Sequence, residues 1–175
     1  HNVENYMAAI AAVDRLVPDK IIRDFAKNFG GVEHRIELVR ELDGVRYYND
    51  SIASSPSRTI AGLNAFPEKV ILIAGGKDKG ISYGSLGPVV NEHVKLLILC
   101  GATAGVIRAS VEQAENYGGL EIADVEDYHQ AVSLARSRAK EGDVVILSPA
   151  STSFDRFANF MERGRVFKEI VNSLK

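Results

Sequence analysis

The strongest constraint on the fold is the order of apolar segments after residue 30. Short, nearly continuous runs of Val, Ile and Leu at 70–74, 96–100 and 144–147 alternate with stretches whose apolar residues recur at helical spacing. Strands without a polar face are typical of sheets covered by helices on both sides, and intervening helices favour parallel connections. The sequence therefore predicts an α/β, Rossmann-like fold with a mainly parallel sheet and helices on both faces.

Two helical stretches precede this pattern, at 2–16 and 18–29, and Gly30-Gly31 follows them. In the α/β part, Asp43-Gly44 between strands at 36–42 and 45–48 indicates a hairpin. Further helices are expected at 57–65, 85–93, 104–117, 128–140 and 154–174. We expect a domain boundary at the glycine pair, which gives domains of residues 1–30 and 31–175. Because the chain begins with His1 and not Met, we also expect it to be part of a longer protein.

The composition limits the classes of partner that this chain is expected to bind. Of the 175 residues, 21 are Lys or Arg and 23 are Asp or Glu, a balance that argues against nonspecific nucleic-acid binding. The single cysteine, Cys100, cannot form an internal disulfide, so a cytoplasmic location is expected. No uncharged apolar run approaches the roughly 18 residues that a bilayer crossing needs, and no membrane partner is predicted.

In parallel sheets, ligands gather beyond the carboxyl ends of the strands, which directs attention to residues 49–57, 75–80 and 148–160. The first of these, Asn49-Asp50-Ser51-Ile52-Ala53-Ser54-Ser55, follows a strand and precedes a helix. It could bind an anion at the helix N-terminus, with Asp50 accepting hydrogen bonds from ribose hydroxyls. It could also be a polar loop with an ordinary helix cap.

The other two segments carry cations and hydroxyls. Gly75-Gly76-Lys77-Asp78-Lys79-Gly80 lacks the spacing of a P-loop and of the dinucleotide fingerprint. Its two ammonium groups suit a carboxylate or phosphate, and a solvated surface turn is the other interpretation. Thr152 and Asp155 have capping-box spacing at the start of the last predicted helix, and the hydroxyls around them would also suit a carboxylate ligand.

The remaining candidates are weak. The four histidines show no metal-ligand spacing and Cys100 has no neighbouring Cys or His, so no metal site is predicted. Cys100 ends an apolar strand, and we expect it to be buried and not nucleophilic. Ser148 before Pro149 forms no G-x-S-x-G elbow, so hydrolase chemistry has no support.

Read together, these segments resemble the Mur ligase superfamily along the whole chain, in order. The matching phrases are His1-Asn2-x-x-Asn5, His34-Arg35, Tyr48-Asn49-Asp50-Ser51 with Ala53, Gly75-Gly76-x-Asp78-Lys79-Gly80, Leu147-Ser148-Pro149-Ala150, Ser153-Phe154-Asp155-x-Phe157-x-Asn159-Phe160 and Glu162-Arg163-Gly164. The Asn-Asp-Ser and Ser-Phe-Asp-x-Phe phrases resemble the member that adds D-glutamate, and not those that add other amino acids or bind folate.

The resemblance implies a ligase of three domains: one for a UDP-sugar, a central P-loop ATPase and a C-terminal Rossmann-like domain for the incoming amino acid. Residues 1–30 would be the helical end of the central domain. The implied reaction, in peptidoglycan precursor synthesis, is ATP-dependent: the carboxylate of UDP-N-acetylmuramoyl-L-alanine becomes an acyl phosphate, which the amine of D-glutamate attacks. ATP and Mg²⁺ would serve the full-length enzyme. This chain would bind neither tightly and would be inactive alone.

The resemblance also implies roles for single residues, none of them catalytic in this chain. The D-glutamate site would have Lys79 and Ser153 at carboxylates, the Phe154 backbone N–H as a donor, Phe160 as pocket wall, and Ser54. The nucleotide site would have Asn2 and Asn5 near adenine, Arg35 at the phosphates and Asp50 at the ribose. Lys77 would be a solvated neighbour.

Three positions depart from the family's pattern. Ile52 stands where Lys is usual, which removes a cation. Ser54 stands where Thr is usual and keeps a hydroxyl. Ser151-Thr152 stands where a Cys-Ala pair is common, and no mechanistic consequence is expected.

Two other functions are compatible with the same fold class. A stand-alone, non-catalytic module could bind an acidic amino acid or a nucleotide. A nicotinamide-dependent oxidoreductase is disfavoured because the dinucleotide glycine fingerprint is missing.

Overall fold

The computed structural model describes the backbone of residues 2–175 and the side chains from Asn5 onward, in two compact units that divide between Gly31 and Val32. The first unit holds helices α1 (Asn2–Val13) and α2 (Asp19–Asn28). Pro18 precedes α2, where its fixed φ suits a helix start. The Phe29 ring stacks on Phe25 and meets Tyr6 of α1 edge-on, at centroid distances of 5.1 and 6.2 Å. No helix in the described part of the chain has the length and apolarity that a membrane span requires.

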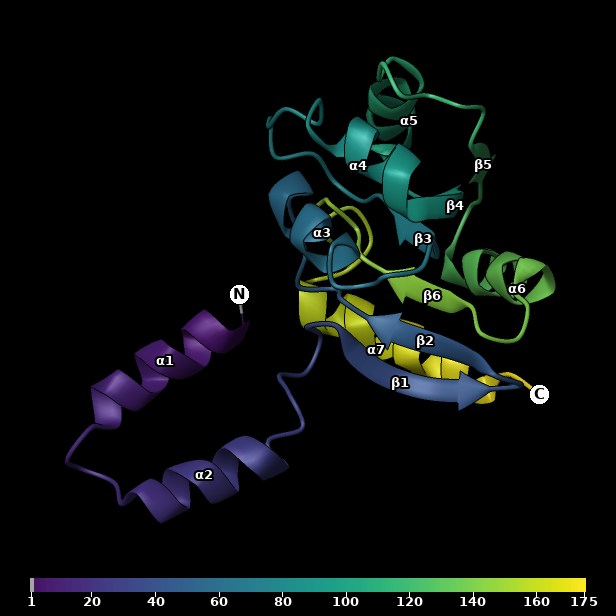
Figure 1. Cartoon of the computed structure of the whole chain (residues 1–175). Coiled ribbons are helices and arrows are strands. Elements are labelled where there is room, and N and C mark those ends of the chain that lie inside the picture. The colour runs from purple at the N-terminus through teal and green to yellow at the C-terminus, as the bar shows by residue number, and fades with distance from the viewer. Residues whose placement is uncertain (1) are drawn as a thin grey trace. The chain divides into compact units, whose positions relative to one another are not determined.

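Within the described residues, the second unit contains a six-stranded sheet, whose strands have the order β1-β2-β6-β3-β4-β5 (Figure 1). The strand β1 pairs antiparallel with β2, and the other pairs are parallel, which confirms the predicted α/β fold with a mainly parallel sheet. The strands are β1 (Glu37–Leu42), β2 (Val45–Asn49), β3 (Val70–Ala74), β4 (Val94–Leu99), β5 (Glu121–Asp124) and β6 (Val144–Leu147).

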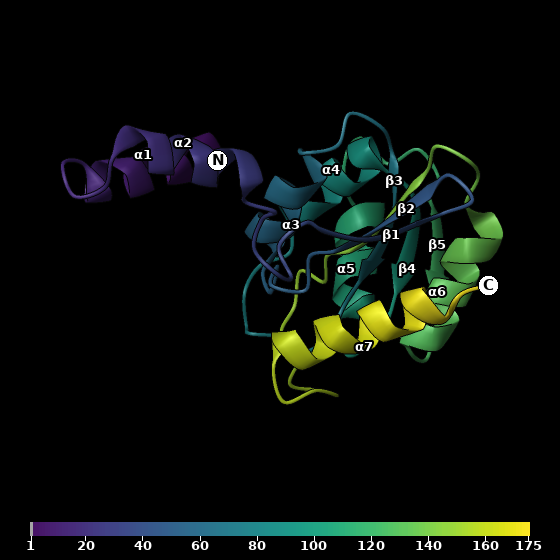
Figure 2. The same cartoon turned by 90° about the horizontal axis from the view of Figure 1, so that it is seen from below.

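Helices cover both faces of this sheet (Figure 2). On one face, Leu72 packs with α3 (Pro56–Leu63), α4 (Leu86–His93) and α5 (Ala104–Glu112). On the other, Ile71 and Ile73 pack with α6 (Tyr128–Arg138) and α7 (Phe160–Ser173). Successive strand residues point to opposite faces, so a continuous apolar run serves both cores.

The hairpin at Asp43-Gly44 is confirmed, and both residues have positive φ, as a tight two-residue hairpin turn requires. The short edge strand β5 was not predicted from the sequence. Its four residues include two charged ones and none is fully buried, so the segment lacks the apolar run that marks the central strands.

The last helix begins at Phe160, so the prediction that it starts at Phe154 is wrong. The predicted capping box at Thr152 and Asp155 is also wrong, because the Thr152 hydroxyl donates to the Lys77 carbonyl oxygen instead. Asn159 is the N-cap, and its Oδ1 accepts a hydrogen bond from the Glu162 N–H over 2.9 Å. Residues 148–159 therefore remain free to form a long loop above the sheet.

Candidate functional site

Three parallel strands bring the predicted ligand segments to one edge of the sheet. The central strand β6 lies between β2 and β3, and its Leu147 pairs with Asn49 on one side and Ile73 on the other. Because the carboxyl ends of parallel strands open at the same edge, residues 49–57, 75–80 and 148–160 leave the sheet side by side.

A short backbone pairing joins the second and third segments. The Lys77 N–H donates to the Thr152 carbonyl oxygen over 2.9 Å, and the Thr152 N–H donates back to Lys77 over 3.0 Å. A Cβ on Gly76 would lie 2.2 Å from the Thr152 oxygen, so this approach requires glycine at position 76. The loop that carries Lys79 is thereby fixed against the residues that precede Ser153.

A side-chain contact adds the first segment to this cluster. The exposed Lys79 ammonium lies 3.4 Å from the hydroxyl oxygen of Ser54, to which it donates. Ser153 is buried, at 3% exposure, whereas the Phe154 side chain is 62% exposed. Within the described residues, the Phe154 N–H donates to no other group. An ammonium, hydroxyls and a backbone donor thus belong to one cluster of loops.

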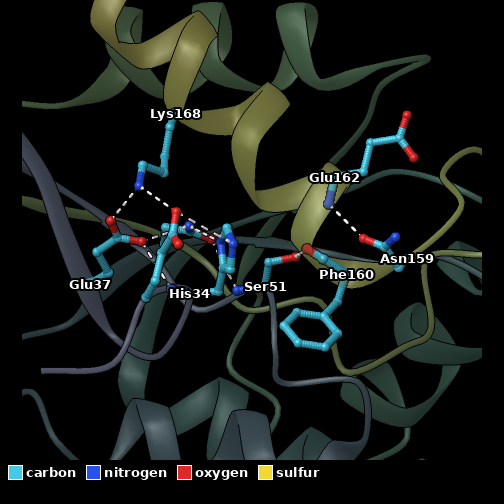
Figure 3. A network of polar contacts seen from close by, with 9 residues as sticks. His34, Glu37, Ser51, Asn159, Phe160, Glu162 and Lys168 are labelled. Carbon is cyan, nitrogen blue, oxygen red and sulfur yellow. Dashed lines mark hydrogen bonds and ion pairs between the residues drawn. The ribbon is translucent and has the colours of Figure 1, made fainter.

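Phe160 lies at the α7 end of the same cluster (Figure 3). Its carbonyl oxygen accepts a hydrogen bond from the Ser51 hydroxyl over 2.7 Å. Its half-buried ring meets the His34 ring edge-on at a centroid distance of 5.9 Å. The start of α7 is therefore tied to the segment that follows β2.

Asp50 is buried beneath the loops and is not exposed on their surface. Its Oδ2 accepts a hydrogen bond from the Ser148 hydroxyl over 2.8 Å, and its Oδ1 accepts one from the Ile36 N–H over 3.3 Å. Burial raises the pKa of this carboxyl from 3.8 to about 6, although both hydrogen bonds favour the ionised form. Exposed Arg35 precedes Ile36 in the chain, so this hydrogen bond also holds the backbone beside Arg35 close to Asp50.

A buried network positions the segment that carries Arg35 (Figure 3). The Asn49 amide nitrogen lies 2.8 Å from His34 Nδ1, which makes that ring nitrogen the acceptor. The backbone N–H of His34 donates to Glu37 Oε2 over 2.9 Å. The backbone of His34 has a φ of 65°. Burial lowers the pKa of His34, so the neutral imidazole that this hydrogen bond requires is favoured.

Within the part of the chain that the structure describes, Glu33, His34 and Glu37 form the one group with three potential metal ligands close together. The Lys168 ammonium already lies 3.1 Å from a Glu33 oxygen and 2.5 Å from a Glu37 oxygen. Because this cation pairs with both carboxylates, the arrangement favours an internal ion-pair network over a metal site.

Arg163 belongs to one of the phrases that resemble the family, but no role was predicted for it. It is 1% exposed, and its hydrogen bonds join two of the loops. Its guanidinium donates to the hydroxyl and carbonyl oxygens of Ser51 over 3.0 and 2.9 Å, and to the Ser151 carbonyl oxygen over 3.0 Å. A signal was present: Arg163 lies four residues before Phe167 on the apolar side of the last helix, where a charged residue is unusual.

The two predicted adenine contacts lie in the first unit. Asn5 is exposed on α1, and the side chain of Asn2 lies outside the described residues. Cys100 is buried as expected, at 4% exposure, and burial raises the pKa of its thiol, which disfavours the nucleophilic thiolate.

Residues 34–151 match the family described as Mur ligase, glutamate ligase domain. Relatives named UDP-N-acetylmuramoylalanine--D-glutamate ligase include those of Ruminiclostridium cellulolyticum, 56% identical over 180 residues, and Acetivibrio thermocellus, 58% identical over 179 residues. Each of these matches covers 100% of this chain and 38% of the relative. The chain thus spans well under half the length of these relatives.

Solved structures share the fold at low identity. A murein peptide ligase of Psychrobacter arcticus matches with a TM-score of 0.61 at 17% identity, covering 100% of this chain and 38% of that one. The MurF ligase of Thermotoga maritima, solved in complex with ADP, matches with a TM-score of 0.60 at 21% identity, covering 94% of this chain and 37% of that one. From the match over residues 34–151 and relatives above 50% identity, the chain belongs to the Mur ligase family.

Proposed function

We propose that this chain is the C-terminal part of a cytoplasmic, ATP-dependent ligase that joins D-glutamate to UDP-N-acetylmuramoyl-L-alanine in peptidoglycan precursor synthesis. The name of the relatives supports this assignment. The observation that carries it is the contact between Lys79 and Ser54 above the Lys77–Thr152 pairing. An ammonium and hydroxyls on converging loops suit the two carboxylates of a small acidic amino acid.

In this proposal the loop cluster is the D-glutamate site. The Lys79 ammonium and the Ser153 hydroxyl bind carboxylates, and the Phe154 N–H donates a further hydrogen bond. Ser54 holds the Lys79 side chain over the site, which limits the rotamers that the ammonium can adopt. Phe160 forms part of the wall. D-glutamate is thereby oriented with its amine directed away from the Lys79 ammonium.

The chemistry needs orientation and charge from this chain rather than a nucleophile. The γ-phosphoryl group of ATP passes to the carboxylate of the UDP-sugar substrate, which gives an acyl phosphate and ADP. The amine of D-glutamate then attacks the acyl carbon, phosphate leaves, and the amine loses a proton as the amide forms. Lys79 and Ser153 hold the attacking amino acid in place, so the second step becomes effectively unimolecular. The sequence contains no P-loop, and we assign phosphoryl transfer to the rest of the ligase.

Nucleotide contacts are proposed on both units. Arg35 would meet the phosphates and Asp50 the ribose, while Asn2 and Asn5 would lie near adenine if residues 1–30 end the central ATPase domain. A ribose hydroxyl that donates to Asp50 would favour its ionised form, which burial alone disfavours. Mg²⁺ is expected to accompany ATP, but the carboxylates of Glu33 and Glu37 already bind Lys168, so this chain's own residues do not fit that ion.

The comparisons favour the ligase over the other functions. The high-identity relatives carry a ligase name over the full length of this chain, which a separate binding module would not predict. Membership of the Mur ligase family likewise leaves the oxidoreductase without support.

Release of inorganic phosphate by the full-length protein tests the proposal. We expect release only when ATP, UDP-N-acetylmuramoyl-L-alanine and D-glutamate are all present, with L-glutamate as the control amino acid. Equal release with both enantiomers, or none with the complete substrate set, would contradict the assignment.

A further inference from the structure

The loop that carries Lys79 is fastened at both ends to buried hydroxyl groups. At its start, the Gly76 N–H donates to Thr103 Oγ1 over 3.0 Å. At its end, the Tyr83 hydroxyl oxygen lies 2.9 Å from Ser151 Oγ. Ser151 Oγ also lies 2.8 Å from Thr103 Oγ1, and either oxygen can donate in these two bonds. Gly76, Thr103, Ser151 and Tyr83 therefore form one connected set, called here the hydroxyl chain.

The hydroxyl chain is buried while the loop between its ends is exposed. Thr103 and Ser151 are 1% exposed and Tyr83 is 3% exposed, whereas residues 77–82 all lie at the surface. Hydrogen bonds away from water are not replaced by solvent when they break, so they hold their partners firmly. Burial also raises the pKa of Tyr83, which keeps its hydroxyl protonated near neutral pH.

Ser151 occupies the middle of this arrangement. We propose that Ser151 is a positioning residue for Lys79: its hydroxyl ties the two ends of the loop together and so directs the ammonium into the amino-acid site. This inference rests on the proposed role of Lys79 in D-glutamate binding. It assigns a consequence to a residue whose replacement of the family's usual cysteine was expected to have none.

The backbone of Ser151 is held independently of its side chain. Its carbonyl oxygen accepts a hydrogen bond from the buried Arg163 guanidinium over 3.0 Å, and the following Thr152 pairs with Lys77. Removing the hydroxyl should therefore loosen the Tyr83 end of the Lys79 loop, while the Lys77–Thr152 pairing still holds its start and the segment that carries Ser153 stays in place. Ser151→Ala breaks both side-chain links, Tyr83→Phe breaks one, and Ser151→Cys leaves a weaker donor and acceptor in place.

Steady-state kinetics of the full-length ligase test this inference. We expect Ser151→Ala to raise the KM for D-glutamate about fivefold, the scale of losing one or two neutral hydrogen bonds. The KM values for ATP and the UDP-sugar should stay within error. Tyr83→Phe should give a smaller rise, and Ser151→Cys should recover much of the loss. Ser137→Ala, which removes a hydroxyl bonded only within α6, is the control and should change none of the three values.

The decisive arm is a double-mutant cycle with Lys79→Ala. If Ser151 acts through Lys79, Ser151→Ala should have no further effect once Lys79 is gone. An effect that persists in that background, equal rises in all three KM values, or unchanged kinetics in Ser151→Ala and Tyr83→Phe would each overturn the inference. If Ser151→Ala fails to fold, the double-mutant cycle with Lys79→Ala can be measured with Tyr83→Phe and Ser151→Cys instead. A wild-type enzyme without D-glutamate-dependent turnover would refute the proposed function itself.

Discussion

Lys77 and Lys79 stand two residues apart on one exposed loop, but their side chains have different surroundings. Lys79 donates to Ser54 on another segment, while among the described residues the Lys77 side chain donates to none. Lys77 contributes through its backbone, which pairs with Thr152. The two lysines therefore form a matched pair for separating a ligand contact from general surface charge.

For the full-length enzyme, we predict that Lys79→Ala lowers kcat/KM for D-glutamate by a factor of about 30 or more, equivalent to about 2 kcal/mol. The reason is the loss of a cation facing a bound carboxylate. Lys77→Ala should change this value less than twofold, and the KM for the UDP-sugar should hold in both variants. If both substrates were affected equally by Lys79→Ala, Lys79 would be a structural residue.

The shifted pKa of Asp50 makes the free energy of unfolding depend on pH. Its pKa is about 6 in the folded chain, against 3.8 for an unperturbed aspartate, so the folded state binds more protons than the unfolded state between these values. The contribution of Asp50 to stability is thus fully present below pH 4 and is lost as pH rises through 6. The difference of about two pKa units corresponds to about 3 kcal/mol at neutral pH.

We therefore predict that Asp50→Asn raises the free energy of unfolding at pH 7.5, by up to about 3 kcal/mol, and by much less at pH 4. Urea denaturation of this chain at the two pH values measures the difference. A variant that is destabilised equally at both would show that the carboxyl is ionised without cost. Retaining a costly buried carboxylate is consistent with a role in ligand binding.

At the scale of elements, α7 owes its position to a glycine. A Cβ on Gly164 would lie 2.2 Å from His34 Nδ1, so the helix can approach the His34–Asn49 pair only because this residue lacks a side chain. Gly105 in α5 is the matched control, because nothing lies within 4 Å of the position its Cβ would occupy.

Gly164→Ala should lower the free energy of unfolding by about 1–3 kcal/mol through overpacking, despite the higher helix propensity of alanine. Gly105→Ala should leave it unchanged or raise it by up to about 1 kcal/mol. Chemical denaturation of both variants makes the comparison. Stabilisation by both substitutions would mean that α7 does not approach His34 as closely as described.

The elements that could be read from the sequence are those with a local cause. The central strands are apolar runs, and the hairpin has its turn residues at Asp43-Gly44. The start of α7 was placed too early, because Thr152 has a capping residue's chemistry but donates its hydroxyl to Lys77, 75 residues away. The local signal for the true start was Asn159 followed three residues later by Glu162. Long-range partners of this kind leave no periodic pattern in the sequence.

The residues of the candidate site likewise fall into those that could be identified from the sequence and those that could not. Lys79, Ser54 and Ser153 were identified from strand-end motifs and a family resemblance, and their roles stay predictions. No role was predicted for Arg163, Thr103 and Tyr83, because their contribution depends on which loops meet, which the strand order determines. Their partners could be named only once β6 was known to lie between β2 and β3.

At the scale of the whole molecule, this chain supplies the proposed D-glutamate site, while phosphoryl transfer is assigned to the rest of the ligase. Isothermal calorimetry of residues 1–175 with D-glutamate should give a millimolar affinity or no measurable heat, because in the proposed reaction the acyl phosphate and the rest of the cleft belong to other domains of the full-length protein. Phosphate release by the chain alone should be absent. Micromolar binding by this chain would show instead that the loop cluster is a complete site, as a stand-alone binding module requires.

The most direct measurement is a crystal structure of the full-length ligase with D-glutamate bound. We predict one D-glutamate at the carboxyl ends of β2, β3 and β6, with carboxylate oxygens within hydrogen-bonding distance of Lys79 Nζ and Ser153 Oγ. Density for the amino acid at any other edge of the sheet, or with no contact to Lys79, would contradict this prediction.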